Sequence, residues 1–119
     1  MNKVKNFLLF IIIILVSGII TSFTVLQSEI KILQINAQWN RRNDINLDHL
    51  PTFYKNIEIK KSFALLEHQT PELKSSIKAV PVIILLVDGQ LKYQWTADLS
   101  FKLNITKTQV QEALNKILK

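Results

Sequence analysis

Residues 80–89 read VPVIILLVDG, and this stretch decides the fold. Its six consecutive apolar residues, 82–87, are mostly β-branched, which is typical of a central strand buried on both faces of a sheet. Asp88 and Gly89 follow as a two-residue hairpin signal, because both residue types accept the positive φ angles of a tight turn. The stretch therefore predicts a buried strand that turns back into an antiparallel partner.

The antiparallel partner is the alternating segment 91–96, which leads through residues 98–105 to a final helix. Successive residues of a strand point to opposite faces, so the large side chains of this segment are expected on one face of the sheet. These side chains are Leu91, Tyr93 and Trp95. The final helix is expected to begin after Thr106, because Thr106 and Gln109 have the spacing of a capping box. Its apolar residues, which keep the spacing of a stripe that faces a core, are Val110, Ala113, Leu114, Ile117 and Leu118.

Two further strands and two further helices are expected before this hairpin. Residues 31–36 and 62–66 are rich in aliphatic residues and predict short strands. A helix is expected from about residue 44 to residue 54, although Pro51 would cost that helix a backbone hydrogen bond. A second helix is expected to begin at Thr70 and to end before the proline at position 81. The whole order predicts one α/β domain over residues 29–119, a four-stranded mixed sheet with helices on both faces.

Residues 1–28 form a separate N-terminal segment. Its stretch 7–26 contains no charged residue and is long enough, as a helix, to cross the hydrocarbon core of a bilayer. Lys3 and Lys5 precede the stretch, which predicts a cytoplasmic N-terminus and a domain on the exported side, periplasmic or extracellular. The same features fit a cleaved signal peptide, after which the domain would be secreted. Membrane lipid is therefore an expected partner of residues 7–26.

Composition excludes several classes of chemistry. The 119 residues include no cysteine, so no disulfide, thiolate nucleophile or cysteine metal site can form. The net charge of +6 is spread along the chain rather than gathered in a stripe with aromatic residues, which argues against nucleic acid as a partner. His49 and His68, the two histidines, lack the spacing of a metal motif. No cofactor, metal site or catalytic residue is therefore expected.

The order of the elements resembles the thioredoxin fold over about residues 30–118. The aromatic turn at Trp39 directly follows the first strand, as an aromatic-rich turn does in that family. The run Val80-Pro81 resembles the cis-proline loop of the family, since it leads into the buried strand and its hairpin. The spacing from Glu67 to this proline is also similar to that of the family. The resemblance implies a thioredoxin-like four-stranded sheet with flanking helices.

The chain departs from the family at the residues that carry its redox chemistry. The family has Trp-Cys-x-x-Cys, whereas residues 39–43 read WNRRN and place Asn40 and Asn43 at the two cysteine positions. Thiol–disulfide exchange needs one thiolate to attack and a second thiol to resolve the mixed disulfide. A carboxamide can do neither. The resemblance therefore implies a redox-inactive member.

Thioredoxin-like proteins hold extended peptides against the backbone just before the cis-proline, so the resemblance implies a protein or peptide partner at this loop. The candidate binding residues are Trp39, Asn40, Arg41, Arg42, Asn43, Val80 and Pro81. Three alternatives stay open. The first is an enzyme of a non-redox class that uses the polar segment 40–49, the second is an accessory subunit of an envelope redox system, and the third is a structural part of a larger membrane assembly.

Overall fold

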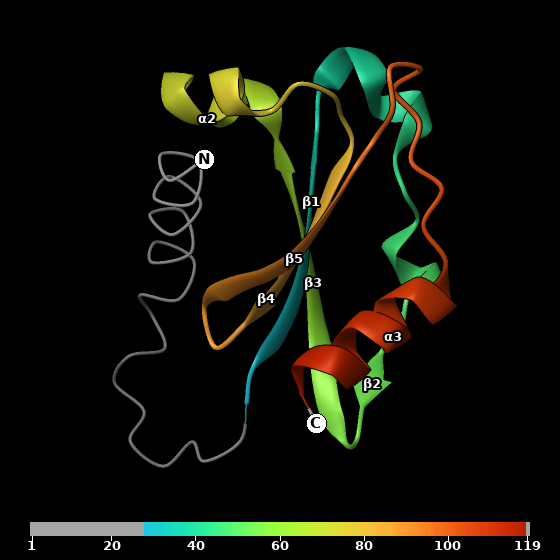
Figure 1. Ribbon diagram of the computed structural model, residues 1–119. Coiled ribbons are helices and arrows are strands. Elements are labelled where there is room, and N and C mark those ends of the chain that lie inside the picture. The colour runs from blue at the N-terminus through green and yellow to red at the C-terminus, as the bar shows by residue number, and fades with distance from the viewer. Residues whose placement is uncertain (1–27, 119) are drawn as a thin grey trace.

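The computed structural model describes residues 28–118, which form a five-stranded mixed sheet with helices on both faces (Figure 1). The α-helices and 3-10 helices (η) follow β1, β3 and β5. The elements are β1 (Ile30–Asn36), η2 (Gln38–Asn43), η3 (Leu47–His49), β2 (Phe53–Tyr54), β3 (Ile57–Leu65), η4 (Leu66–His68), α2 (Pro71–Ser76), β4 (Val82–Val87), β5 (Gln90–Thr96) and α3 (Lys107–Ile117). The expected membrane segment 7–26 lies outside these residues. Within residues 28–118, no helix has the length and apolarity needed to cross a bilayer.

The strand order across the sheet is β2-β3-β1-β4-β5. Strand β1 pairs in parallel with β3 and antiparallel with β4, and β4 pairs antiparallel with β5. Every residue of β4 is buried, and Asp88 and Gly89 have φ angles of 53° and 79°, so the predicted central strand and tight hairpin turn are both confirmed. These four strands form the expected mixed sheet, and β2 adds a short fifth strand at one edge.

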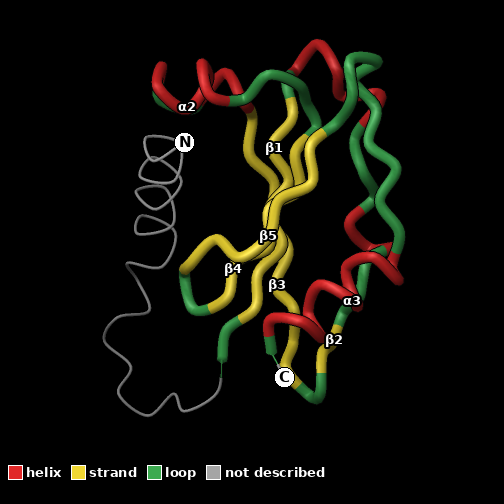
Figure 2. The backbone as a smooth tube through the Cα atoms, in the orientation of Figure 1, coloured by secondary structure: helices red, strands yellow, loops and turns green. Residues whose placement is uncertain are grey.

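Two apolar layers lie on the two faces of the sheet. Figure 2 shows the backbone, with α2 and α3 on opposite sides of the strands. On one face α3 packs over alternate residues of β1 and β4, and its Thr106 capping box forms as expected. The buried residues of this layer are Ile30, Ile32, Leu50, Tyr54, Ile59, Ile83, Leu85, Val110, Ala113 and Leu114. On the other face α2 contributes Leu73, which is fully buried against the second layer. The rest of that layer consists of Leu33, Ile35, Val82, Ile84 and Leu86.

The predicted helix over residues 44–54 is wrong. This stretch instead contains η3 and the two-residue strand β2, separated by irregular chain. The buried side chain of Gln34 explains part of the difference, because it bonds to both the N–H (2.8 Å) and the carbonyl (2.9 Å) of Ile45, as a neighbouring strand would. Pro51 has no N–H to donate to a helix. The tertiary hydrogen bonds of Gln34 therefore override the local helix propensity of residues 44–54.

The predicted face of β5 is also wrong at one residue. A β-bulge lies between the pairs Leu85–Tyr93 and Leu86–Leu91, so Lys92 has no partner on β4. Because one extra residue reverses the alternation of a strand, Leu91 packs in the α2 layer while Trp95 packs in the α3 layer.

The second predicted strand begins earlier than expected, at Ile57, because Lys55 and Asn56 form another two-residue turn with φ angles of 47° and 69°. This turn joins β2 to β3 and is the reason the sheet has five strands instead of the expected four. Asparagine tolerates the left-handed conformation better than most residues, which suits Asn56 to this position.

Candidate functional site

The turn after β1 is built on buried amide side chains. Among the described residues, Gln34, Asn36 and Asn40 are the buried polar ones. The Nδ2 group of Asn36 donates to the carbonyl of Asn40 (3.0 Å) and to Oδ1 of Asp44 (2.6 Å), and its Oδ1 accepts from the N–H of Ala37 (2.9 Å). A buried polar group needs such partners to offset its desolvation. The amide of Asn36 therefore fixes the shape of η2 from beneath.

Asn40, which the thioredoxin resemblance aligns with the first family cysteine, has a side chain that joins three segments. Its Nδ2 group lies within hydrogen-bond distance of Oδ1 of Asn36 (3.0 Å), the carbonyl of Val80 (3.2 Å) and the carbonyl of Phe101 (3.1 Å). Its Oδ1 accepts from Nδ2 of Asn43 (2.7 Å). Two amide protons thus serve three oxygens, and the side chain ties η2 to the proline loop and to the turn after β5.

The proline loop lies in the interior. The Val80–Pro81 peptide bond is cis, both residues are buried, and Val80 is 2% exposed. The carbonyl of Val80 already accepts the amide of Asn40. The expected binding residues therefore fall into three groups by exposure. Asn40, Val80 and Pro81 form the base of the site and Asn43 is half-buried, while Trp39, Arg41 and Arg42 reach solvent.

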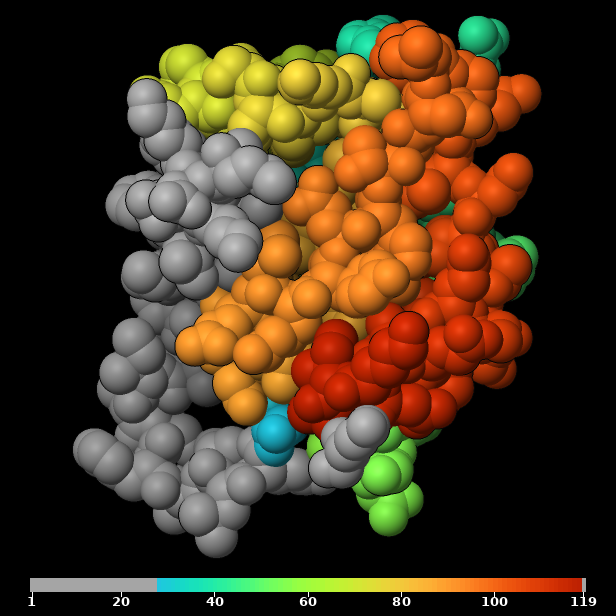
Figure 3. Space-filling model, viewed as in Figure 1, coloured from blue at the N-terminus to red at the C-terminus, as the bar shows by residue number. Residues whose placement is uncertain are grey.

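Trp39 is a large exposed side chain at this end of the sheet. The residue is 63% exposed, and its ring meets the ring of Phe101 edge-on with centroids 4.9 Å apart. Phe101 has a φ angle of 60°, a left-handed conformation that costs a bulky residue about 1–2 kcal/mol. Leu99, two residues earlier in the same turn, is 88% exposed. In Figure 3 this turn stands at the top of the molecule, beside the atoms of η2.

Asp98 holds that turn closed. Its Oδ1 accepts hydrogen bonds from the hydroxyl of Ser100 and from the N–H of Ser100 (2.8 Å). These two bonds, the hydroxyl bond first, keep the pKa of the Asp98 carboxyl below its ordinary value. The N–H of Phe101 also donates to the carbonyl of Asp98 (3.1 Å), so the turn that carries Leu99 and Phe101 is held at several points.

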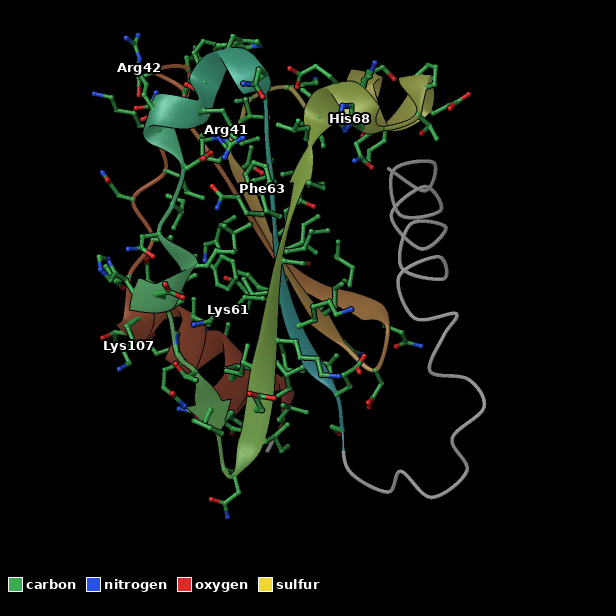
Figure 4. All side chains as sticks on the ribbon, turned by 180° about the vertical axis from the view of Figure 1, so that it is seen from behind. Arg41, Arg42, Lys61, Phe63, His68 and Lys107 are labelled. Carbon is green, nitrogen blue, oxygen red and sulfur yellow. The ribbon has the colours of Figure 1, made fainter. Side chains whose placement is uncertain are left out.

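The two arginines of η2 differ in their surroundings. Arg41 forms an ion pair with Asp44 (2.7 Å) and lies over the ring of Phe63, 4.6 Å from its centroid (Figure 4). Arg42 is exposed, and it forms no ion pair with any residue from 28 to 118. Arg41 therefore packs on the edge of the sheet, whereas the guanidinium of Arg42 is open to solvent.

The groups that could support catalysis lie apart from this surface. His49 is exposed and has a ring nitrogen 3.3 Å from the side-chain amide of Asn46, and His68 is exposed on η4. Within residues 28–118, no three side chains of the kinds that ligate metals come together. The amides of the segment 40–49 bond mainly to backbone and to one another, so they shape the chain rather than activate a nucleophile.

No sequence pattern indicated Leu99, a place for Phe101 in the site, or the network of Gln34 and Asn36. Phe101 is 62 positions from Trp39, and nothing local to either residue indicates their contact. The signal that was present is the length of the segment 98–105, which is longer than a plain strand-to-helix connection needs.

Comparisons with known proteins add little. No protein-family model matches the chain, and no curated protein matches it. A solved structure of thioredoxin-2, described as a component of the malaria parasite protein secretion machinery, is similar to this chain, with 20% sequence identity and a TM-score of 0.49. The matched region includes 77% of this chain and 86% of the thioredoxin-2 chain.

Proposed function

We propose that this chain is a redox-inactive, thioredoxin-like protein-interaction module that contacts its partner through the surface around Trp39. The observation that carries the proposal is the exposure of Trp39 on a turn whose shape is fixed from beneath by Asn40. Exposed tryptophan held in one place is a common anchor of protein interfaces, and arginine is another. We call Trp39, Arg42, Leu99 and Phe101 the Trp39 surface.

The proposed lack of redox activity follows from the amino-acid composition. The chain has no cysteine, so it cannot carry out thiol–disulfide exchange. The position of the first family cysteine is held by Asn40, which is buried and engaged with four other groups. A reactive group at this position would have to be accessible and ionised. The side chain that is present serves the architecture of the turn instead.

The exposed apolar area of Trp39 would favour binding if a partner covered it. A tryptophan side chain that is 63% exposed leaves roughly 150 Å² in water, and covering that area would contribute up to about 4 kcal/mol. Leu99, 88% exposed, would add to this gain. Because the turn is held by Asp98 and Asn40, little conformational entropy is lost when a partner covers it.

The location of the module is part of the proposal. Residues 7–26, which the structure does not describe, have the length and apolar character of a membrane segment. They would hold the domain at the membrane on the exported side or, if cleaved, deliver it there as a secreted protein. A partner on that side of the membrane fits both outcomes.

A pull-down of the full chain from solubilised membranes tests the binding role. Trp39→Ala is expected to abolish recovery of a specific partner, and Arg42→Ala is expected to weaken it. Phe53→Ala is the matched control, because Phe53 is an aromatic residue of similar exposure (59%) on β2, outside the Trp39 surface. Equal recovery by the Trp39 and Phe53 variants would contradict the proposal.

A further inference from the structure

One edge of the sheet is left partly unpaired. Strand β2 is two residues long and pairs only with Ile57 and Glu58 of β3. One more bond, from the N–H of Ile59 to the carbonyl of Thr52 (2.8 Å), extends this pairing. Beyond it, residues 60–65 pair with β1 on their inner side, and no strand among residues 28–118 pairs with their outer side.

The outward-facing backbone groups of this edge can be identified. The N–H of Ile59 points outward to Thr52, and strand residues direct their backbone groups to alternate sides, so Lys61, Phe63 and Leu65 also point outward. The carbonyl of Leu65 accepts the side-chain amide of Gln69 (3.0 Å). No described residue bonds to the backbone N–H or carbonyl of Lys61 or Phe63. These groups form a row that can pair with a further strand.

The opposite edge of the sheet is less suited to strand addition. Strand β5 is seven residues long, but the bulge at Lys92 interrupts its regular spacing. A bulge is a feature by which edge strands avoid pairing with other chains. Residues 59–65 of β3 contain no bulge, and their pairing with β1 runs without a register shift.

The side chains that flank the open edge are cationic. Arg41 lies over the ring of Phe63, and Lys60 and Lys61 precede that residue on the strand (Figure 4). The ammonium of Lys60 is 3.4 Å from a carboxylate oxygen of Glu29, and that of Lys61 donates to the carbonyl of Leu50 (3.0 Å). An incoming strand that carries carboxylates would therefore find cations on both faces of the sheet.

We propose that the outer edge of β3, residues 60–65, accepts an extended acidic strand from a partner protein. Main-chain hydrogen bonds to Lys61 and Phe63 would supply the pairing, and carboxylates of the partner would face Lys60, Lys61 and Arg41. A second copy of this chain fits the edge poorly, because two copies would bring two sets of these cations together. The proposal uses a surface separate from the Trp39 surface, so the failure of one does not decide the other.

A designed peptide tests the edge directly. The probe is a fluorescent hexapeptide of alternating glutamate and valine, and its binding to the purified full chain is followed by fluorescence anisotropy. Two N-methylated probes, one methylated on the glutamates and one on the valines, separate backbone pairing from charge attraction. Because a strand pairs through the N–H groups of alternate residues, one of the two is expected to bind about tenfold more weakly or worse, while the other retains binding. Equal binding by the two methylated probes would overturn the proposal.

Charge-reversal variants test the choice of partner. Lys60→Glu is expected to weaken binding of the unmethylated probe by about tenfold, because a carboxylate then faces the acidic strand. Lys92→Glu is the matched control, since it makes the same change of charge at the opposite edge of the sheet. Both lysines are exposed, so neither variant is expected to unfold the domain. If the two variants weaken binding equally, the peptide responds to net charge alone and the proposed edge is wrong.

Discussion

Replacement of Asn40 by alanine removes the buried amide on which the turn after β1 depends. The substitution deletes the donor to the carbonyls of Val80 and Phe101 and to Oδ1 of Asn36, and it deletes the acceptor for Asn43. Oδ1 of Asn36 keeps its bond from Ala37. The carbonyls of Val80 and Phe101 lose the bonds that Asn40 makes to them. Asn40→Ala is therefore expected to destabilise the domain more than a typical polar substitution.

The magnitude follows from the number of groups involved. Each lost hydrogen bond costs roughly 1 kcal/mol net, and a carbonyl left buried without a partner costs about 1–3 kcal/mol. The expected loss is about 3 kcal/mol, which is a large share of the roughly 5–15 kcal/mol by which small domains are stable. For a domain of this size the corresponding fall in Tm is about 15 °C.

The assay is thermal and urea denaturation of the full chain, followed by circular dichroism. Asn43→Ala is the matched control, because it removes one hydrogen bond, to the same Asn40 oxygen, from a half-buried position. That variant is expected to lose less than about 1 kcal/mol. If Asn40→Ala lowers Tm no more than Asn43→Ala does, Asn40 does not tie the three segments together and the reasoning about the turn is wrong.

Three further predictions concern the same fold. Asn40→Cys combined with Asn43→Cys is expected to give a dithiol that oxidises to a disulfide, because the two side chains touch at 2.7 Å; thiol titration that finds both thiols free after oxidation would refute this placement of the turn. Thr106→Ala removes the N-cap of α3 and is expected to cost about 1 kcal/mol in urea denaturation, and an unchanged midpoint would contradict the cap. The folded pKa of Asp98 is lowered by its bonds from Ser100, so its contribution to stability is full above its ordinary pKa of about 3.9 and is lost as the pH falls through the lower folded pKa. Asp98→Asn is therefore expected to flatten the dependence of Tm on pH below about pH 4, and equal slopes in variant and parent would count against it.

The parts of the fold that sequence predicts well are those with local signals. Strand β4 is a continuous apolar run, and the hairpin after it is marked by Asp88 and Gly89. Helix α3 begins at a capping box that needs only Thr106 and Gln109, three residues apart. In each case the residues that determine the structure are close together in the sequence, so the sequence pattern is enough to predict it.

The crossover from β1 to β3 could not be predicted in this way. The side-chain amides of Gln34 and Asn36, both on β1, set its path. Gln34 bonds to the backbone of Ile45, and Asn36 bonds to the backbone of Asn40 and to the side chain of Asp44. These are tertiary contacts, and they override the helical pattern of residues 44–54. A single extra residue in β5 likewise moves Leu91 to the other face, and alternation alone gives no sign of it.

The candidate site was likewise predicted only in part from the sequence. Sequence indicated Trp39 and Arg42 because the resemblance placed them next to the proline loop, and both reach solvent. It also indicated Asn40 and Val80, which the fold buries and bonds to each other. Whether a backbone carbonyl is free to bind a partner or already accepts a hydrogen bond depends on the tertiary structure. A sequence pattern therefore cannot predict it.

Site-specific photo-crosslinking of the full chain in the cells that produce it tests the central claim most directly. A benzoylphenylalanine introduced in place of Trp39 would report what lies against that turn, and the same group in place of Phe53 would report on an aromatic position of similar exposure at β2. The proposed module predicts a discrete adduct with one partner protein from position 39 and none from position 53. Identical adduct patterns from the two positions, or no protein adduct from position 39, would contradict it.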